Sequence, residues 1–257
     1  MKRVLALDFD GVIWDSVGEC FVMARRVFTE MYGLPCSDLE AAFRRGRWLV
    51  RTGGDFLLVL QLAMADPDGD LTQFSKVQFE KLQHEKAAET EAFSREFYAL
   101  REKTRDEHWN EWVSFQQPYP LLLQQVDDLR RVFDQIVVCT TKDTKSAQML
   151  LASAGLELPI YGKELALHKG DQINALCKQQ GVEPSQIFFI DDLVENLDQV
   201  RPSGAACGLA AWGYNTASER QRAVAEGYPV LEVFSLAQDL KNILDSPAPN
   251  EQCHSPG

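Results

Sequence analysis

The chain of 257 residues has few basic residues, no paired cysteines and no long apolar run. Its sequence therefore lacks the usual features for binding nucleic acid or zinc or for spanning a membrane. Its 26 Lys and Arg are outnumbered by 38 Asp and Glu, for a net charge of −12, so a nonspecific grip on DNA, RNA or anionic lipid is not expected. The six cysteines include no C-x-x-C pair, which argues against structural zinc and indicates reduced thiols. No apolar run is long enough for a membrane span or a signal-peptide core. We expect a soluble, cytoplasmic protein that binds neither nucleic acid nor a membrane.

Short apolar runs predict a parallel sheet. They read "RVLALDF", "QIVVCTT", "QIFFIDD" and "CGLAAWG", and such runs are typical of buried parallel strands. Helical patterns at 143–154, 169–180 and 194–201 lie between the later runs, and "YPVLEVFSLAQDLKNILDS" predicts a last short strand and helix. Strands that alternate with helices indicate a doubly wound, Rossmann-like α/β fold, whose ligands gather at the carboxyl ends of the strands.

An insertion separates the first two predicted strands. The interval of roughly a hundred residues is too long for an ordinary connection, and its pattern is helical. We predict helices at 17–32, 37–51 and 54–65, then a long polar stretch from 71 to 115. Its expected buried anchors are Phe74, Phe93, Phe97, Trp109 and Trp112. The predicted division is a core at 1–15 and 118–245, an all-helical inserted domain at 16–117, and a disordered tail at 246–257, which is rich in Pro and Ser.

Polar and charged residues follow the predicted strands. Asp8 and Asp10 come after the first run, Thr140 after the second, and Asp191 with Asp192 after the third, while Lys169 begins a helix. Carboxyl ends of parallel strands share one edge of a sheet, so these groups should converge there. Carboxylates gathered in this way need a cation or a proton to offset their repulsion.

The same residues resemble the motifs of the haloacid dehalogenase (HAD) superfamily of phosphatases. The motifs occur in order as "LALDFDGV", "IVVCTT", a lysine and "IFFIDDLVEN". The resemblance covers the predicted core and extends to "LAAWGYN", which resembles phosphoglycolate-phosphatase-like members, and the inserted helices match the place of the family's helical C1 cap. The resemblance implies a Mg²⁺-dependent phosphatase that hydrolyses a small phosphorylated metabolite through an aspartyl-phosphate.

The resemblance also implies a role for each motif residue. Asp8 would be the nucleophile, and Asp10 would protonate the leaving oxygen and then act as a base. Mg²⁺ would bind Asp8, the Asp10 carbonyl and Asp192, with Asp191 as a further ligand or as a neighbour of one.

The remaining motif residues would bind the phosphoryl group. Thr140, Lys169 and the backbone amides of Phe9 and Asp10 would contact its oxygens, with the Thr141 amide as a further donor. Lys142 and Lys163 are alternatives for the motif lysine, and Lys169 is preferred because it begins the helix before "IFFIDD". Asp15 is interpreted as a helix N-cap.

Three arginines of the insertion, Arg44, Arg47 and Arg51, have the i, i+3, i+7 spacing of one helical face. Arg47 and Arg51 could bind a second anionic group of the substrate, and an exposed face with salt bridges is the alternative interpretation.

Other functions compete with the phosphatase. A phosphomutase of the same superfamily is disfavoured because mutases resembling β-phosphoglucomutase carry Thr and His where this chain has Trp14 and Cys20. A catalytically silent HAD-fold binding protein is the other alternative, although every catalytic residue type is present. A receiver domain fits poorly, since its acid pair lies near the N-terminus and its lysine late in the chain.

Overall fold

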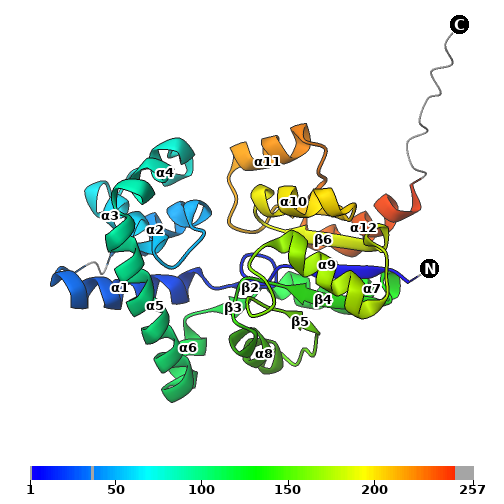
Figure 1. Cartoon of the computed structure of the whole chain (residues 1–257), viewed down its shortest axis with the longest axis horizontal. Coiled ribbons are helices and arrows are strands. Elements are labelled where there is room, and N and C mark those ends of the chain that lie inside the picture. Colours follow the sequence, from blue (N-terminus) through cyan, green and yellow to red (C-terminus); the bar gives the residue numbers. More distant parts are fainter. Residues whose placement is uncertain (1, 36–37, 247–257) are drawn as a thin grey trace, which may run out of the picture.

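A six-stranded parallel sheet lies at the centre of the computed structural model, which describes residues 2–35 and 38–246 (Figure 1). The strand order is β5-β4-β1-β6-β7-β8, and every neighbouring pair is parallel. The strands are β1 (Val4–Leu7), β4 (Gln135–Cys139), β5 (Ile160–Tyr161), β6 (Ile187–Asp191), β7 (Ala206–Ala210) and β8 (Val230–Leu231). The predicted doubly wound α/β fold is confirmed.

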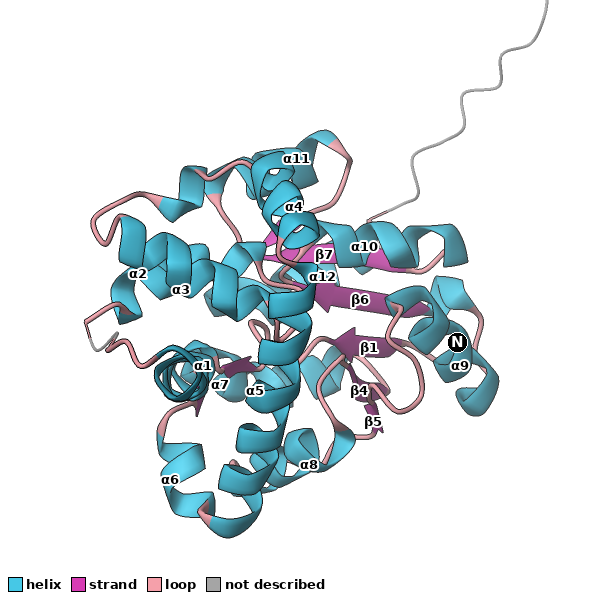
Figure 2. Cartoon of the chain, turned by 60° about the vertical axis from the view of Figure 1, so that its left-hand side comes forward, coloured by secondary structure: helices cyan, strands magenta, loops and turns pink. Residues whose placement is uncertain are grey.

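Helices bury both faces of this sheet (Figure 2). Successive strand residues point to opposite faces, so Leu5 and Leu7 pack in one hydrophobic cluster and Val4 and Ala6 in another. The first cluster includes residues of α7 (Pro120–Val132), α8 (Thr144–Ser153) and α12 (Leu236–Asp245). The second includes residues of α9 (Lys169–Gln180), α10 (Val194–Val200) and α11 (Ala217–Ala225). Burial on both faces explains why the strands are almost continuously apolar.

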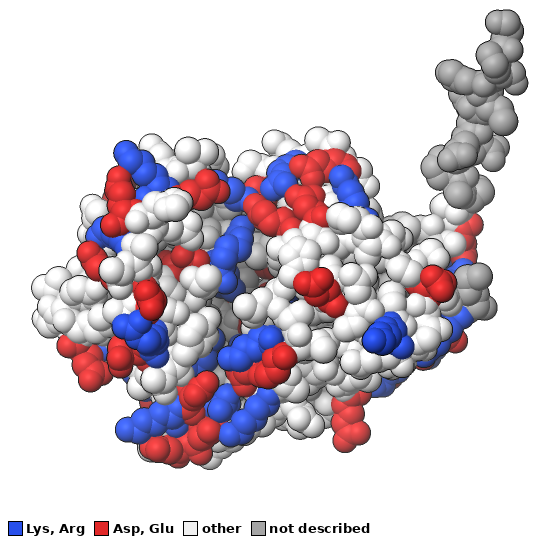
Figure 3. Space-filling view, in the orientation of Figure 1, with Lys and Arg blue, Asp and Glu red and all other residues white. Residues whose placement is uncertain are grey.

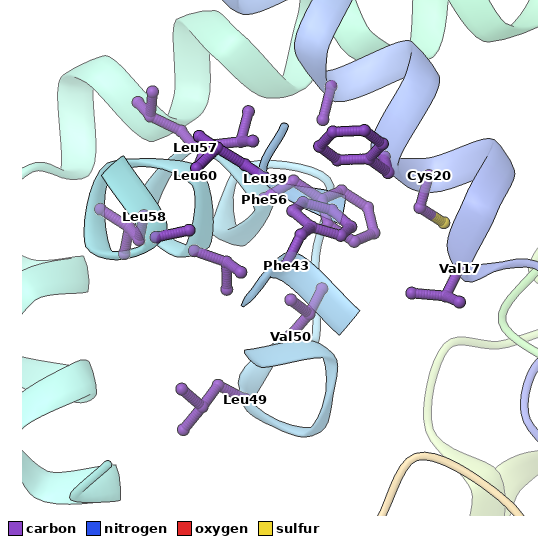
Figure 4. Packing of buried hydrophobic residues seen from close by; sticks show 14 of the residues in the cluster. Val17, Cys20, Leu39, Phe43, Leu49, Val50, Phe56, Leu57, Leu58 and Leu60 are labelled. Carbon is purple, nitrogen blue, oxygen red and sulfur yellow. The ribbon is translucent and has the colours of Figure 1, made fainter. Parts of the chain in front are cut away.

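The insertion forms a separate body of helices beside the sheet, here called the cap (Figure 1). Its helices are α1 (Val17–Tyr32), α2 (Glu40–Gly46), α3 (Asp55–Ala65), α4 (Lys76–Glu85), α5 (Ala87–Glu107) and α6 (Trp109–Ser114), with short 3₁₀ turns η1 (Arg47–Leu49) and η2 (Leu71–Gln73). Most of them share a hydrophobic cluster of their own, in which Phe43 and Phe56 stack at 5.5 Å between ring centroids (Figure 4). Where the chain passes between cap and core, β2 (Trp14–Asp15) pairs antiparallel with β3 (Gln117–Pro118).

The predicted helix at 37–51 is wrong in its second half; residue 37 lies outside the described residues. Helix α2 ends at Gly46, the 3₁₀ turn follows, and Val50 is extended. A side chain at Gly46 would come within 2.7 Å of Val59, and the indole of Trp48 donates to the carbonyl of Leu71 at 2.8 Å. These tertiary contacts turn the chain inward, so Arg51 lies outside the helix and the predicted three-arginine helical face does not form.

Other differences concern elements that packing defines. Trp112 belongs to the hydrophobic cluster that contains Leu5 and Leu7, and Trp109 packs against the same cluster rather than against the cluster of the cap. Strand β5 and helices α7 and α11 were not predicted. Strand β5 has only two residues, too few for a pattern, whereas α7 carries Leu122, Val126 and Leu129 at helical spacing after a Pro at its start. The predicted boundaries between core, insertion and tail stay a prediction. Of the predicted tail, the residues beyond Ser246 lie outside the described residues.

Two findings bear on the bulk expectations. Within the described residues, no helix is both long enough and apolar enough to cross a bilayer. The described cysteines Cys20, Cys139, Cys177 and Cys207 are all free thiols.

The cap cluster should contribute strongly to folding. Phe97 is fully buried and lies 4.9 Å from the ring of Phe56, so Phe97→Ala should lower the free energy of unfolding by about 3–5 kcal/mol through lost burial and the cavity left behind. Urea unfolding measures the loss. The control Val77→Ala removes a side chain that is 74% exposed and should change stability by less than about 0.5 kcal/mol. Equal stability of the two variants would show that the cap cluster does not stabilise the fold.

Candidate active site

A tight loop after β1 carries the first acids. The amide of Asp8 donates to Ile190 at 2.9 Å, which continues the pairing of β1 with β6, and the carbonyl of Phe9 accepts from the amides of Ile13 and Trp14. Gly11 turns this loop with φ of +92°, a region that favours glycine. A Cβ there would also lie 2.2 Å from a carboxylate oxygen of Asp192. The loop therefore needs glycine both for its backbone and for its distance from the neighbouring acid.

Lys169 lies among the acids at the carboxyl ends of β1 and β6. Its Nζ donates to Asp8 Oδ1 at 2.5 Å and to the Cys139 carbonyl at 2.6 Å, and it lies 3.4 Å from Asp191 Oδ2. Burial alone would lower the pKa of Lys169, but the negative charges of Asp8 and Asp191 outweigh it and raise that pKa. The lysine is therefore a fixed positive charge beside Asp8.

Asp8, Asp191 and Asp192 form a buried group of carboxylates. One oxygen from each lies within 4.8 Å of the others. Burial raises the pKa of Asp8 to about 7, with Asp191 adding to the rise and Lys169 opposing it. Burial and the charge of Asp191 also raise the pKa of Asp192. When all three are ionised, the group carries more negative charge than one lysine offsets, which favours a proton or a cation there.

Hydrogen bonds hold the two later acids in place. Asp191 Oδ1 accepts from the Leu193 amide at 3.0 Å, and Asn196 Nδ2 donates to Asp191 Oδ1 and Oδ2 at 2.9 and 3.0 Å. Asp192 Oδ2 accepts from the Tyr214 amide at 2.6 Å. A Cβ at Gly213 would lie 2.2 Å from the Cβ of Asp192. The loop after β7 therefore fixes Asp192 by direct backbone contact.

The structure places a second lysine, Lys142, beside Asp10. The Nζ of Lys142 lies 3.1 and 3.4 Å from the Asp10 oxygens, and its amide donates to the Thr140 hydroxyl at 3.0 Å. Burial alone would raise the pKa of Asp10, but the charge of Lys142, a hydrogen bond from Ser16 and the charges of Arg101 and Arg47 together lower that pKa. Sequence reasoning considered Lys142 only as a substitute for Lys169, and only the tertiary structure reveals its contact with Asp10.

The other residues named from the sequence lie as follows. Thr140 is buried, with its carbonyl accepting from Gln172 at 2.7 Å, whereas the Thr141 side chain is exposed. Within the described residues, the backbone amides of Phe9, Asp10 and Thr141 donate no hydrogen bond. Lys163 lies over the ring of Tyr98 of the cap at 5.6 Å. The N-cap of α1 is Ser16 and not Asp15 as predicted. Asp15 lies one residue earlier, and its carboxylate accepts from the Val17 amide at 3.2 Å.

The cap contributes a largely buried arginine, Arg101, that the sequence analysis did not single out. Arg101 on α5 donates to both oxygens of the fully buried Glu19 on α1, at 2.9 and 2.6 Å, and Trp112 Nε1 donates to the same carboxylate at 3.0 Å. The guanidinium also lies 4.5 Å from the centroid of the Phe97 ring. Because Glu19 and Arg101 are 82 positions apart, no local pattern signals their contact.

Ion pairs join cap and core along the hollow between them, where basic side chains gather (Figure 3). Glu195 of α10 pairs with Arg51 at 3.1 Å and with Lys76, both from the cap. Lys76 also pairs with Glu219 of α11 at 3.0 Å. At another point of the boundary, Arg105 of α5 pairs with Asp143 at 2.9 Å. The cap is thus tied to the core by ionic contacts outside its hydrophobic cluster.

Comparisons with known proteins identify the class. The family model of haloacid dehalogenase-like hydrolases matches residues 2–198, so the chain belongs to that family of hydrolases. No curated protein matches the chain.

Solved structures share the fold at low identity. A haloacid dehalogenase-like family protein of Streptococcus pneumoniae is 19% identical, with 95% of this chain and 99% of that chain covered and a TM-score of 0.63. A "predicted phosphoglycolate phosphatase" of Haemophilus somnus is 16% identical, with 93% and 98% covered and a TM-score of 0.64. A "predicted phosphatase" of Clostridium acetobutylicum is 16% identical, with 96% and 100% covered and a TM-score of 0.59.

The Glu195 contacts should make stability depend on pH. Burial alone would raise the pKa of Glu195, but Arg51 and Lys76 lower it to about 2. A carboxylate with a lowered pKa stabilises the folded state above its unfolded pKa, near 4.5, and loses this effect as the pH falls toward 2. Glu195→Gln should therefore cost about 1 kcal/mol at pH 7 and progressively less below pH 4.5.

Unfolding of both proteins in urea at pH 7, 5, 4 and 3 measures this difference. Glu91→Gln is a matched control, because Glu91 forms an exposed pair within α5 and should show a smaller difference at pH 7. A Glu195→Gln difference that stays constant with pH would contradict the expectation.

Proposed function

We propose that the protein is a Mg²⁺-dependent phosphatase that hydrolyses a small phosphorylated metabolite through an aspartyl-phosphate at Asp8. The observation that carries the proposal is the position of Asp8, 2.5 Å from Lys169 Nζ and grouped with the oxygens of Asp191 and Asp192 within 4.8 Å. Membership of the hydrolase family supports hydrolysis, and the descriptions of the solved neighbours favour a phosphate ester.

The carboxylate group suits Mg²⁺ because it offers only oxygen donors and carries excess negative charge. In this proposal Asp8, Asp192 and the carbonyl of Asp10 hold the ion, and it supplies positive charge that reduces repulsion between nucleophile and phosphate. Both oxygens of Asp191 accept hydrogen bonds from Asn196, so Asp191 stands beside the ligands and orients the site.

The chain's own residues carry the reaction in two displacements. A carboxylate oxygen of Asp8 attacks phosphorus, the bond from phosphorus to the alcohol oxygen breaks, and Asp10 gives that oxygen a proton. Water then attacks the same phosphorus, Asp10 takes a proton from the water, and the bond to Asp8 breaks to release phosphate. Lys169 and the Thr140 hydroxyl stabilise the charge on the phosphoryl oxygens. The backbone amides of Phe9, Asp10 and Thr141, which donate no hydrogen bond within the described residues, do the same.

The contact between Lys142 and Asp10 bears on the first proton transfer. Without a ligand, Lys142 keeps the pKa of Asp10 low, which suits a base more than an acid. A bound phosphate ester brings negative charge beside Asp10 and competes for the Lys142 ammonium, and both effects raise the pKa of Asp10 toward that of a proton donor. Substrate binding would thus prepare Asp10 for its first role.

The setting of the reaction follows from bulk properties. We infer that the enzyme works in the cytoplasm on a small substrate, without nucleic acid or membrane as partner. The net charge of −12 disfavours polyanionic partners, and the free thiols suit a reducing compartment.

The first test of this proposal is phosphate release from p-nitrophenyl phosphate and a panel of metabolite phosphates. Turnover should require Mg²⁺, stop with EDTA, and fall at least about a thousandfold in Asp8→Asn, since the variant lacks the nucleophile. Asp127→Asn, at a position that is 83% exposed, is the matched control and should retain wild-type turnover.

Contrary results separate the alternatives. Turnover that survives in Asp8→Asn would contradict the aspartyl-phosphate. A folded wild-type protein that releases no phosphate from any ester would favour a silent binding protein, and transfer of phosphate between two hydroxyls of a sugar without release would indicate a phosphomutase.

A further inference from the structure

Tyr214 belongs to the core by its place in the chain and to the cap by its packing. It lies in the loop between β7 and α11, yet its ring packs in the hydrophobic cluster of the cap with residues of α1, α2 and α3. Within the described residues, every other buried member of that cluster lies in the range 17–97. Tyr214 is therefore the point at which the loop after β7 joins the packing of the cap.

The hydroxyl of Tyr214 holds the segment by which the chain enters the cap, residues 14–16, here called the entry linker. This hydroxyl accepts from the Ser16 amide at 2.7 Å and donates to Asp15 Oδ1 at 3.0 Å. Ser16 is the N-cap of α1 and is buried. The other oxygen of Asp15 accepts from Arg44 of α2 at 2.9 Å. The contacts of one hydroxyl therefore extend to two helices of the cap.

The backbone of the same residue holds an acid of the proposed active site. The Tyr214 amide donates to Asp192 Oδ2 at 2.6 Å, and a Cβ added at Gly213 would lie 2.2 Å from the Cβ of Asp192. In the same loop, Asn215 Nδ2 donates to the Asp192 carbonyl at 3.2 Å. A shift of this backbone would therefore change the position or the hydrogen bonding of the Asp192 carboxylate.

Close packing does not force the contacts of the entry linker. Asp15, Arg44 and Tyr214 all line a cavity of about 260 Å³, to which both cap and core contribute residues. Protein interiors are otherwise densely packed, and a side chain beside a cavity has room for other rotamers. The hydrogen bonds of the Tyr214 hydroxyl are therefore what selects the position of the linker.

We propose that Tyr214 is a positioning residue that couples the placement of the cap to the placement of Asp192. The inference rests on the proposed phosphatase function, in which Asp192 is a ligand of Mg²⁺. When the cap packs on the Tyr214 ring and the entry linker binds its hydroxyl, the loop after β7 is fixed and Asp192 is preorganised for the ion. When the cap moves away, the loop loses both supports. Coupling of this kind is reciprocal, so an ion at Asp192 also favours the bound linker.

Binding of Mg²⁺ to the substrate-free protein tests this coupling. Tyr214→Phe keeps the ring and the backbone amide and removes only the hydroxyl. We expect its Kd for Mg²⁺, measured by isothermal titration calorimetry, to be at least about fivefold higher than that of wild type, the lower end of typical coupling between sites. Mg²⁺ should also slow amide hydrogen exchange of residues 14–18 in wild type and leave it unchanged in Tyr214→Phe.

Tyr228→Phe is the matched control. Tyr228 is also a buried tyrosine of the core, and its hydroxyl donates to a carboxylate, that of Asp198, at 2.8 Å. Its ring packs in the cluster that contains Val4 and Ala6 and not in the cluster of the cap. The Tyr228→Phe variant should therefore bind Mg²⁺ with the wild-type Kd and show the wild-type exchange.

Arg44→Gln approaches the same contacts from the cap. It removes the partner of Asp15 on α2 and leaves Tyr214 and its loop intact. Loss of a positive charge would by itself favour a bound cation, so a higher Kd for Mg²⁺ must come from the lost contact. If Tyr214→Phe does not fold, a higher Kd in Arg44→Gln supports the inference, and an equal or lower Kd overturns it.

The outcomes separate this inference from the proposed function. A folded wild-type protein that neither binds Mg²⁺ nor releases phosphate from any ester contradicts the phosphatase and the inference with it. Metal-dependent turnover, together with equal Kd values and equal exchange in wild type and Tyr214→Phe, leaves the phosphatase intact and overturns the role of Tyr214.

Discussion

Repulsion among buried carboxylates is the constraint on which this structure depends. Strands β1 and β6 are parallel neighbours, so their carboxyl ends coincide and bring Asp8 against Asp191 and Asp192. Removal from water and mutual repulsion both disfavour the charged state, which is why the pKa of Asp8 rises to about 7 despite Lys169 at 2.5 Å. The surrounding hydrogen bonds and glycines hold the carboxylates against this repulsion, and a divalent cation would offset it.

The same constraint bears on the cap. In the proposed function an acidic site would repel a phosphate ester, and the chain as a whole carries −12, so positive charge would have to be local. The core supplies Lys169 and Lys142, and the cap adds Arg47 and Arg101 from different elements. The hydrophobic cluster of the cap, with Phe97 beneath Arg101 and Phe56 near Arg47, positions both guanidinium groups. Folding of the cap and the placement of its guanidinium groups are therefore linked.

Sequence reasoning could predict features that repeat locally and could not predict those that depend on tertiary contact. The β1, β4, β6 and β7 runs are apolar on both faces, so the strands and the groups at their ends were recognisable, as was the helix that begins at Lys169. The prediction of a helix at 37–51 was wrong because Gly46 packs against Val59 and the Trp48 indole binds the Leu71 carbonyl. Hydrophobic periodicity along the sequence does not show such tertiary contacts. Likewise, the contact of Lys142 with Asp10 spans 132 positions, and the hydrogen bond from the Trp112 indole to Glu19 spans 93 positions.

Two arginines of the cap, Arg47 and Arg101, differ in how far the fold satisfies them. In the proposed function, the groups that act on the phosphate come instead from the ends of the parallel strands, which leave them little freedom to vary. Arg101 is held by Glu19 and Trp112, so its charge is present whether or not a ligand is bound. Within the described residues Arg47 forms no ion pair, and it lies on a short turn whose course depends on Gly46. The fold therefore holds Arg101 by an acid of the cap itself, whereas it holds Arg47 by aromatic rings and one backbone carbonyl.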